Sequence, residues 1–344
     1  MPRTVSPEVA GSLRRLGLRP RELVLYVNSA CNLRCQHCYV GDRLLDAAES
    51  YHAPDLVAFA ASFPGLRRVT VLGGEPFLYR GINEVLGGLT ALGVGELRVT
   101  TNLTGFFHFD SAKAEPSDFL VAVSLDGHSA EPHDSVRGAG TFARTSANIR
   151  WLVDRGWTVE ITHTVTRPTV DELPSMLALC RELGVRLLNL HLVSPMGNAL
   201  AHPELVVGPD HWAEACARLR GLARDDGDLR VRYPPLFVSE AEYRALCASG
   251  EYHPHAAGSF YADGDRVVLY PNGEVYISSE AFGTDALLGR VEEGRFRANP
   301  GRDNELTRYA ADPTVNASEY TGGRSGSHDR PRVLSVSYKR IIRV

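Results

Sequence analysis

Residues 23–38 read LVLYVNSACNLRCQHC, a short apolar run followed at once by Cys31, Cys35 and Cys38. The C-x₃-C-x₂-C spacing places three thiols in the loop that is expected after a β-strand. Three thiolates hold three corners of an iron–sulfur cube, whereas such clusters are normally ligated by four cysteines. The spacing therefore predicts a cluster whose fourth iron keeps an open coordination position for chemistry.

Two other interpretations of the cysteines stay open at this point. A structural zinc site has four protein ligands and no open position, so His37 or a remote group would have to be the fourth ligand. No second C-x₂-C pair follows in the sequence. A disulfide with one spare thiol is the other interpretation, although nothing in the sequence indicates secretion. The spacing favours the open cluster over both.

Composition and charge exclude several classes of partner. The chain has 344 residues, of which 44% are hydrophobic and 23% are charged, and its net charge is −4. No basic block indicates nucleic-acid binding, and no apolar run reaches the about 20 residues of a membrane span. The N-terminus lacks the apolar core of a signal peptide. We therefore expect a cytoplasmic protein with no nucleic-acid and no membrane partner.

Short β-rich runs alternate with helical patterns from about residue 22 to residue 192. Gly93, Gly156 and Gly184 follow three of the helical patterns, as C-terminal stops do. The alternation predicts an α/β fold of six parallel βα units, a partial (β/α)₆ TIM barrel that is open on one side. The predicted strands cover residues 23–27, 68–72, 96–101, 119–125, 157–165 and 185–192, and the predicted helices include 54–62, 82–92, 142–155 and 171–183.

In a closed barrel, the strand face that points inward carries mostly Val, Ile and Leu, whereas these strands have one polar face. Successive side chains alternate between the two faces of a strand, so the polar set should line the lumen. Because many buried polar groups without partners would be too costly, we expect the lumen to hold a polar ligand. The predicted lumen set is Tyr26, Asn28, Thr70, Thr100, Asn102, Ser124, Asp126, Glu160, Thr162, Thr164, Asn189 and His191.

The pattern changes after residue 200. Helical segments at 209–224 and near 239–248 flank a proline-broken stretch, and Asn272-Gly273 between two alternating runs predicts a β-hairpin. Residues 299–331 have the polar, Gly-rich composition of a mobile segment. The predicted domains are an N-terminal lead-in (1–21), the partial barrel (22–200), a small C-terminal α+β cap (201–298) and a polar, partly mobile tail (299–344).

Three motifs together resemble the radical S-adenosylmethionine (radical SAM) superfamily. They are the cysteine run, the run Gly73-Gly74-Glu75-Pro76 after the second strand, and Val123-Ser124-Leu125-Asp126-Gly127 on the fourth. Downstream, His133-Asp134, Arg137-Gly138 and Phe142 resemble the subgroup that carries a SPASM or twitch extension. The resemblance covers about residues 22–200.

The resemblance implies a [4Fe–4S] cluster and S-adenosylmethionine (SAM) as cofactors, with an external one-electron reductant such as flavodoxin or ferredoxin. Reductive cleavage of SAM would yield a 5′-deoxyadenosyl radical that takes a hydrogen atom from the substrate. The Gly-Gly-Glu run is expected at the SAM amino group, His37 near the adenine, and the polar residues of the fourth strand at the ribose or methionine side. The implied ligands are Cys31, Cys35 and Cys38 for the cluster, and His37, Gly73, Gly74, Glu75, Asn102, Ser124 and Asp126 for SAM.

The sequence departs from the subgroup at its C-terminal extension. SPASM and twitch extensions usually hold auxiliary clusters through several cysteines around a hairpin. Here Ser278 and Ser279 follow the hairpin, and no cysteine follows Cys247. We therefore expect no auxiliary cluster, and a degenerate twitch-like cap that serves as a substrate lid. Cys180 and Cys216 are expected to pack in the core.

Without a second cluster, a reaction on a small polar substrate such as a sugar nucleoside or aminoglycoside fits best. The chain is similar to cytosylglucuronate decarboxylases of the blasticidin type, which implies loss of a sugar carboxylate. The alternatives are a sugar epimerase or dehydrogenase, a peptide maturase and, remotely, a non-catalytic metal-binding protein. The predicted substrate contacts are Arg98 (paired with the carboxylate), Glu160, Asn189 and His191, and the predicted catalytic residues are Glu160 or His191 for proton transfer and Cys247 for hydrogen-atom donation.

Overall fold

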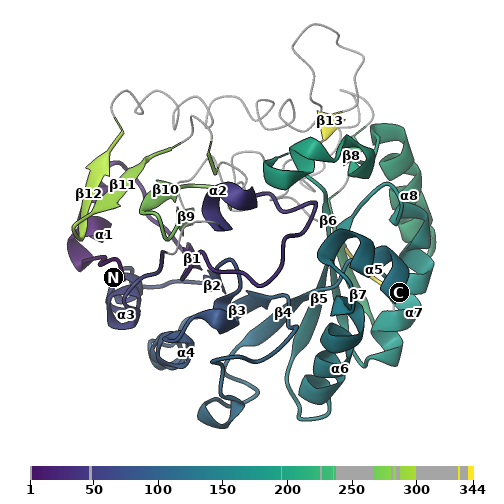
Figure 1. The fold of residues 1–344 in the computed structure, drawn as a ribbon, viewed down its shortest axis with the longest axis horizontal. Helices are drawn as coiled ribbons and strands as arrows, with labels where there is room; N and C mark the ends of the chain where they lie inside the picture. The colour runs from purple at the N-terminus through teal and green to yellow at the C-terminus, as the bar shows by residue number, and fades with distance from the viewer. Residues whose placement is uncertain are drawn as a thin grey trace, which may run out of the picture.

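A curved, open β-sheet with helices on its outer face forms the fold (Figure 1). Its strands are rich in Val, Leu, Ile and Thr, and the β-branched residues among them favour the strand conformation. The computed structural model describes residues 2–45, 49–194, 196–224, 227–234, 236–237, 266–279, 282–283, 287–299, 332–333 and 340–344.

The six predicted strands are confirmed, and they pair in parallel in the order of the chain. The second and third strands have the predicted bounds, and the others differ by one or two residues at their ends. This parallel arrangement brings the carboxyl ends of all six strands to one end of the barrel. The strands are β1 (Glu22–Tyr26), β2 (Arg68–Leu72), β3 (Glu96–Thr101), β4 (Leu120–Ser124), β5 (Val159–Val165) and β6 (Leu187–Leu192).

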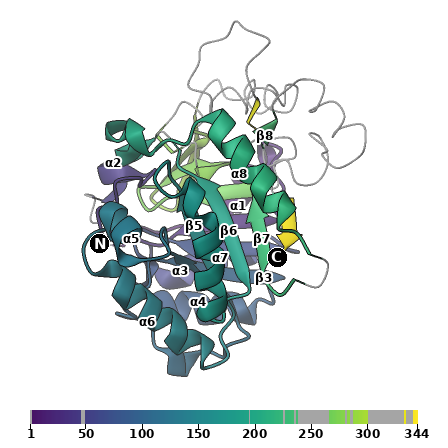
Figure 2. The same ribbon diagram turned by 90° about the vertical axis from the view of Figure 1, so that its right-hand side faces the viewer.

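Helices cover the outer face of the sheet, as Figure 2 shows for α6, α7 and α8. Gly93, Gly156 and Gly184 adopt φ values of 66°, 81° and 70° just after three helices, which confirms them as C-terminal stops. The α-helices are α1 (Pro7–Arg15), α2 (Gly41–Leu45), α3 (Ala53–Ala61), α4 (Ile82–Ala91), α5 (Ala130–Arg137), α6 (Thr141–Val153), α7 (Leu173–Glu182) and α8 (Pro209–Gly221). Short 3₁₀ helices are η1 (Pro76–Leu78), η2 (Ser111–Lys113), η3 (Val170–Glu172), η4 (Gly197–Ala201) and η5 (Pro203–Leu205).

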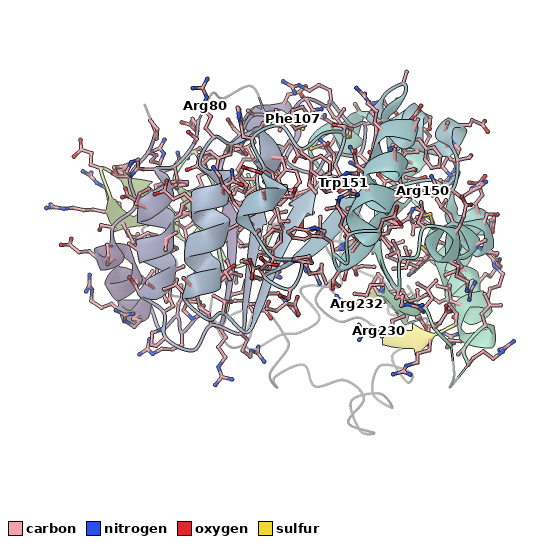
Figure 3. The ribbon with its side chains drawn as sticks, turned by 90° about the horizontal axis from the view of Figure 1, so that it is seen from below. Arg80, Phe107, Arg150, Trp151, Arg230 and Arg232 are labelled. Carbon is pink, nitrogen blue, oxygen red and sulfur yellow. The ribbon has the colours of Figure 1, made fainter. Side chains whose placement is uncertain are left out.

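Two strands beyond the predicted barrel extend its parallel sheet. β7 (Arg230–Tyr233) pairs in parallel with β6, and β9 (Arg266–Leu269) pairs in parallel with β1. On their other sides β7 pairs with β14 (Arg340–Arg343) and β9 with β10 (Glu274–Tyr276), so the described strands form an open sheet. In Figure 3, Phe107 marks the end of the barrel where the strands run into loops, and Arg230 and Arg232 of β7 lie toward the opposite end.

The predicted hairpin is confirmed, since β9 and β10 are antiparallel around Asn272-Gly273. The sheet continues through β11 (Gly289–Glu292) and β12 (Arg295–Ala298), while β8 (Leu236–Phe237) and β13 (Arg332–Val333) form a separate pair. Strands from the predicted cap therefore extend the barrel sheet, and the domain boundaries stay predictions. The helix expected near 239–248 and the mobile segment at 299–331 lie outside the described residues, apart from Asn299.

A continuous apolar core lies between the sheet and its helices. Cys180 and Cys216 are both buried in it, as expected. The Trp212 indole, also buried there, donates a hydrogen bond of 2.9 Å to the Pro234 carbonyl. Among the described segments, no helix has the length and apolar character needed to cross a bilayer.

Candidate functional site

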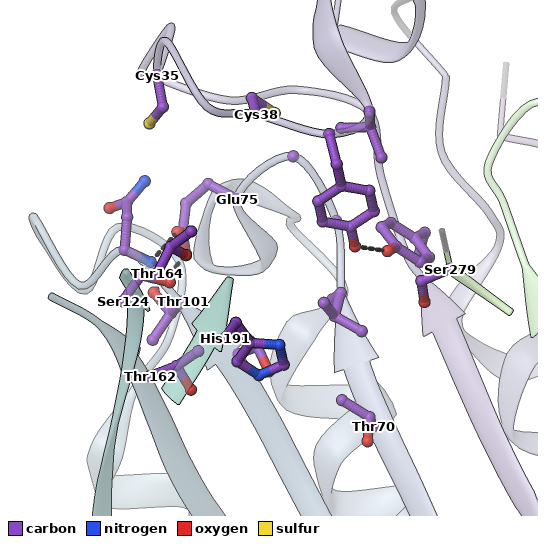
Figure 4. A pocket seen from close by; sticks show the side chains of 18 of the residues that line it. Cys35, Cys38, Thr70, Glu75, Thr101, Ser124, Thr162, Thr164, His191 and Ser279 are labelled. Atoms are coloured by element: carbon purple, nitrogen blue, oxygen red, sulfur yellow. Dashed lines mark hydrogen bonds between the residues drawn. The ribbon is translucent and has the colours of Figure 1, made fainter. Parts of the chain in front are cut away.

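A cavity of about 590 Å³ occupies the barrel lumen and reaches the loops at the carboxyl ends of the strands. Figure 4 shows Cys35 and Cys38 on the loop at one side of it and Thr70 and Thr162 on the strands. Most of the predicted lumen set lines this cavity, because alternation along a strand fixes the direction of each side chain. The confirmed lining residues of that set are Tyr26, Thr70, Thr100, Asn102, Ser124, Thr162, Thr164, Asn189 and His191.

The three cysteines of the motif are free thiols that all line the cavity. Their loop is held by Asn198, whose backbone N–H donates to the Cys38 carbonyl (2.9 Å) and whose side-chain amide donates to the Cys35 carbonyl (3.1 Å). The Leu33 backbone N–H lies 3.4 Å from the Cys31 sulfur and donates to it. One end of the cavity therefore carries three thiols on a braced loop.

Burial raises the pKa of the Cys31 thiol to about 12 and also raises the pKa values of Cys35 and Cys38. Thiolates at this position therefore need positive charge beside them, which bound iron supplies. Among the described residues, no three Cys, His, Asp or Glu side chains converge to hold a single metal ion. Three sulfur donors on one loop, with no fourth protein ligand beside them among the described residues, fit a cluster better than a structural zinc ion.

Asp126 is fully buried and is not one of the residues that line the cavity. Its carboxylate accepts a hydrogen bond from Arg137 Nε, lies 2.9 Å from His37 Nε2, and accepts from the Thr164 backbone N–H at 2.7 Å. Burial alone would raise the pKa of Asp126, but Arg137 and His37 hold it well below its usual range. Asp126, which the sequence predicted as a SAM contact, therefore positions two other side chains that do line the cavity, Arg137 and His37.

Arg137 connects this buried carboxylate to the cysteine loop. Its Nη1 atom lies 3.8 Å from the Cys35 sulfur, and its Nη2 atom lies 3.4 Å from His37 Nε2. The sequence motif contained Arg137 but suggested no role for it. Residue spacing gave no signal for this contact, because Arg137 and Cys35 are far apart in the chain.

The Gly-Gly-Glu run packs against the loop that leads to the cysteines. A Cβ on Gly74 would lie 2.4 Å from the Ser29 carbonyl oxygen and 2.5 Å from that of Ala30, so the close approach requires glycine. The buried Glu75 carboxylate accepts hydrogen bonds from Thr101 Oγ1 (2.7 Å) and from the Asn102 backbone N–H (2.8 Å).

Glu75 accepts a third hydrogen bond, from the Phe77 backbone N–H (3.0 Å). Burial raises the pKa of Glu75 to about 7 despite these donors. A cationic group in the cavity would favour its ionised form. Gly73 and Gly74 line the same part of the cavity.

The predicted substrate contacts divide into two groups. Asn189 and His191 line the cavity and lie 3.1 Å apart between Asn189 Nδ2 and His191 Nε2. Arg98 also lines it, but its guanidinium is already bound by Glu160, with Nη1 2.7 Å from Oε1 and Nη2 3.1 Å from Oε2. Glu160 is 1% exposed and is not one of the cavity-lining residues. Cys247 lies outside the described residues.

Three further arginines that the sequence reasoning missed line the cavity, namely Arg68, Arg232 and Arg266. Arg68 stands two residues before Thr70 and so shares its face of β2. That alternation was a usable signal. No comparable signal existed for the other two, because β7 and β9 were not predicted to belong to the barrel.

Comparisons with known proteins agree with the fold and the motifs. Residues 25–180 match the family profile described as Radical SAM superfamily. The chain is 33% identical over 297 residues to the mycofactocin maturase MftC of Mycolicibacterium smegmatis, covering 83% of this chain and 70% of that protein. It is 26% identical over 195 residues to an AdoMet-dependent heme synthase of Nitratidesulfovibrio vulgaris, and spans about half (52%) of that relative's length.

Solved structures with low sequence identity share the fold. SuiB of Streptococcus suis bound to S-adenosylmethionine has a TM-score of 0.64 at 14% identity, covering 90% of this chain and 73% of SuiB. The protein anSMEcpe with bound AdoMet and a peptide has a TM-score of 0.60 at 15% identity, covering 84% of this chain and 82% of that one. These likenesses concern the open α/β barrel.

Proposed function

Because the chain belongs to the radical SAM superfamily, we propose that it cleaves SAM reductively and removes a hydrogen atom from a polar substrate held in the barrel lumen. Members of this family use a [4Fe–4S] cluster and SAM. The observation that carries the proposal is a single cavity lined by the three motif cysteines, the Gly-Gly-Glu run and a polar lumen wall.

The residues present fit the cluster. Cys31, Cys35 and Cys38 would hold three of its irons, and the Leu33 N–H and the Arg137 guanidinium already point at two of the sulfurs. When bound, the cluster would supply the electron for reductive cleavage of SAM, the chemistry by which hydrogen would be removed from the substrate. The reductant is expected to be a flavodoxin or ferredoxin.

The chain's own residues would bind and orient SAM. Glu75, held by three donors, has lone-pair positions left for the SAM amino group. His37, fixed by Asp126, would lie beside the adenine. Asn102 and Ser124, both on the cavity wall, would contact the ribose or methionine side. In this proposal Asp126 acts through Arg137 and His37.

For the substrate, we propose a small sugar nucleoside, with decarboxylation of a glucuronyl group of the cytosylglucuronate type as the reaction. The polar wall and the arginines of the lumen support an anionic sugar. His191 is the proposed proton-transfer group in the cavity. Glu160 would influence the substrate only by holding the Arg98 guanidinium. Cys247 stays a proposal as hydrogen-atom donor.

Peptide maturation is the second candidate, and the likeness to MftC favours it because that match extends over most of this chain. SuiB has been solved with its precursor peptide SuiA, at 16% identity and a TM-score of 0.57. A sugar epimerase or dehydrogenase is a third candidate. These candidates share the SAM chemistry and differ in what enters the lumen.

Anaerobic reconstitution with iron and sulfide, followed by dithionite and SAM, tests the proposal. We expect 5′-deoxyadenosine from the unmodified protein and from a Cys216→Ala control, and none after replacing Cys31, Cys35 and Cys38 by alanine. Failure of the reconstituted protein to form 5′-deoxyadenosine would refute the proposal. Incubation with cytosylglucuronate, aminoglycosides and precursor peptides then separates the candidates, with release of CO₂ expected from the first.

A further inference from the structure

Seven charged side chains form a network at the amino-terminal end of the strands, which we call the charged floor. They come from strands on both sides of the opening as well as from the middle of the sheet. In Figure 3, Arg232 lies toward this end of the barrel. The charged floor consists of Arg266 (β9), Glu22 (β1), Arg68 (β2), Glu96 and Arg98 (β3), Glu160 (β5) and Arg232 (β7).

Cations and anions alternate along the charged floor. Glu22 Oε2 lies 3.5 Å from Arg266 Nη2, and Glu22 Oε1 lies 3.3 Å from Arg68 Nη1. Arg68 Nε is 2.9 Å from Glu96 Oε1, which lies 3.3 Å from Arg98 Nη2. Glu22 of β1 thus holds arginines of β9 and β2, and Glu96 of β3 holds Arg68 of β2 and Arg98 of its own strand.

The two kinds of charge face different ways. All four arginines of the charged floor line the large cavity, and none of its three glutamates does. Among the described residues that line the cavity, Glu75 is the one acidic side chain, and it lies beside the cysteine loop. The deep end of the cavity is consequently cationic, with the compensating carboxylates behind it.

The arginines of the charged floor give this wall of the cavity a cationic character. Arg67, 4.0 Å from Glu22, lies at its edge. An anionic ligand in the cavity would accept hydrogen bonds from this wall and offset part of the cost of burying its cations.

Arg232 is the member least tightly held. Its Nη1 atom lies 3.6 Å from Glu160 Oε2, whereas Arg98 holds the same carboxylate at 2.7 and 3.1 Å. Its side chain is 30% exposed. Burial and the neighbouring Arg98 and Arg68 guanidinium groups lower the pKa of Arg232, although Glu160 opposes this shift. Its guanidinium therefore has hydrogen-bond donors to offer a ligand.

We propose that the charged floor is an anion subsite in which Arg232 donates hydrogen bonds to a carboxylate or phosphate group of the substrate. The proposal rests on the proposed function in one respect, that the substrate occupies this lumen. It names Arg232 in place of Arg98, the carboxylate partner expected from the sequence, because Glu160 already holds the Arg98 guanidinium. With this subsite, the substrate is a small anionic molecule whose anionic group binds at the end of the cavity opposite the cysteines.

Binding of matched hexoses to the reconstituted protein with SAM and without reductant tests the subsite. The probes are D-glucuronate for a carboxylate, D-glucose 6-phosphate for a phosphate, and neutral D-glucose. We expect at least one anion to bind roughly tenfold to hundredfold more tightly than glucose, the range that a charge-assisted hydrogen-bond pair supplies. The preferred anion identifies which group the subsite takes.

Arg232→Gln should abolish that preference, and Arg232→Lys should restore part of it because the charge returns. Arg230→Gln is the matched control, since Arg230 is exposed, stands two residues earlier on β7 and does not line the large cavity. Circular dichroism of each variant checks the fold. Equal binding of glucose and both anions, no binding of either anion, or an unchanged preference in Arg232→Gln would each overturn the subsite. Formation of 5′-deoxyadenosine by the unmodified protein tests the proposed function separately.

Discussion

Replacing Gly74 by alanine should destabilise the protein through a collision between backbones. The added Cβ would lie 2.4 Å from the Ser29 carbonyl oxygen and 2.5 Å from the Ala30 carbonyl oxygen. Ordinary contacts of a Cβ atom begin at 3.4 Å, and no side-chain rotation relieves a clash with backbone oxygens. Overpacking of a rigid site costs typically about 1–3 kcal/mol, and two backbone collisions place Gly74→Ala at about 3 kcal/mol.

Gly87→Ala is the matched control for this prediction. Gly87 lies inside α4, is exposed, and has no atom within 4 Å of the position that a Cβ would take. Alanine there should raise the free energy of unfolding by about 0.5–1 kcal/mol, because glycine is a poor helix former. The free energies of unfolding of the two variants should therefore differ by about 4 kcal/mol.

Urea denaturation of the reduced apo-protein, followed by circular dichroism, measures the difference. The Gly74→Ala midpoint should fall clearly below that of the unmodified protein, and the Gly87→Ala midpoint should equal or exceed it. Gly74→Ala should also bind less iron after reconstitution, because residues 29–30 lead directly into Cys31. Equal midpoints for the two variants would refute the reasoning.

Three further predictions concern the buried charges near the cysteine loop. Burial lowers the pKa of His133 to about 4, so the unfolded chain binds a proton at this histidine before the folded chain does as the pH falls from about 6.5. The free energy of unfolding should therefore drop by at most about 3 kcal/mol by pH 4. Denaturation at several pH values measures this drop, and a His133→Gln variant with the same pH slope would contradict the prediction. Asp126→Asn leaves the Arg137 cation buried without its anion and should cost about 3–5 kcal/mol, measured by urea denaturation at pH 7; an unchanged midpoint would contradict the assignment. Arg137→Gln removes a cation 3.8 Å from the Cys35 sulfur and should make the reconstituted cluster harder to reduce, which an EPR-monitored redox titration reads as a more negative midpoint; an unchanged midpoint would show that Arg137 has no electrostatic effect there.

Local sequence patterns predicted much of the barrel. Alternation of apolar and polar residues located six strands, and it predicted most of the cavity wall, because side-chain direction along a strand depends only on position. Glycines after the helices marked their ends, since a left-handed turn favours glycine wherever it occurs. The cysteine spacing and the Gly-Gly-Glu run predicted a shared cofactor site, and the structure brings both motifs to the same cavity.

Contacts between distant segments depended on the tertiary structure alone. That β9 pairs with β1, and β7 with β6, is invisible to local patterns because it depends on which strand edges remain free once the barrel has formed. The same pairing brings Arg232 and Arg266 into the lumen. The tertiary structure also places Glu160 of β5 against the Arg98 guanidinium of β3, a contact that no local pattern predicts. The sequence by itself determined which motifs, the cysteine run and the Gly-Gly-Glu run, form one end of the cavity, because each motif is continuous in the chain. Only the fold decided that the other end is cationic, because its charges come from six different strands.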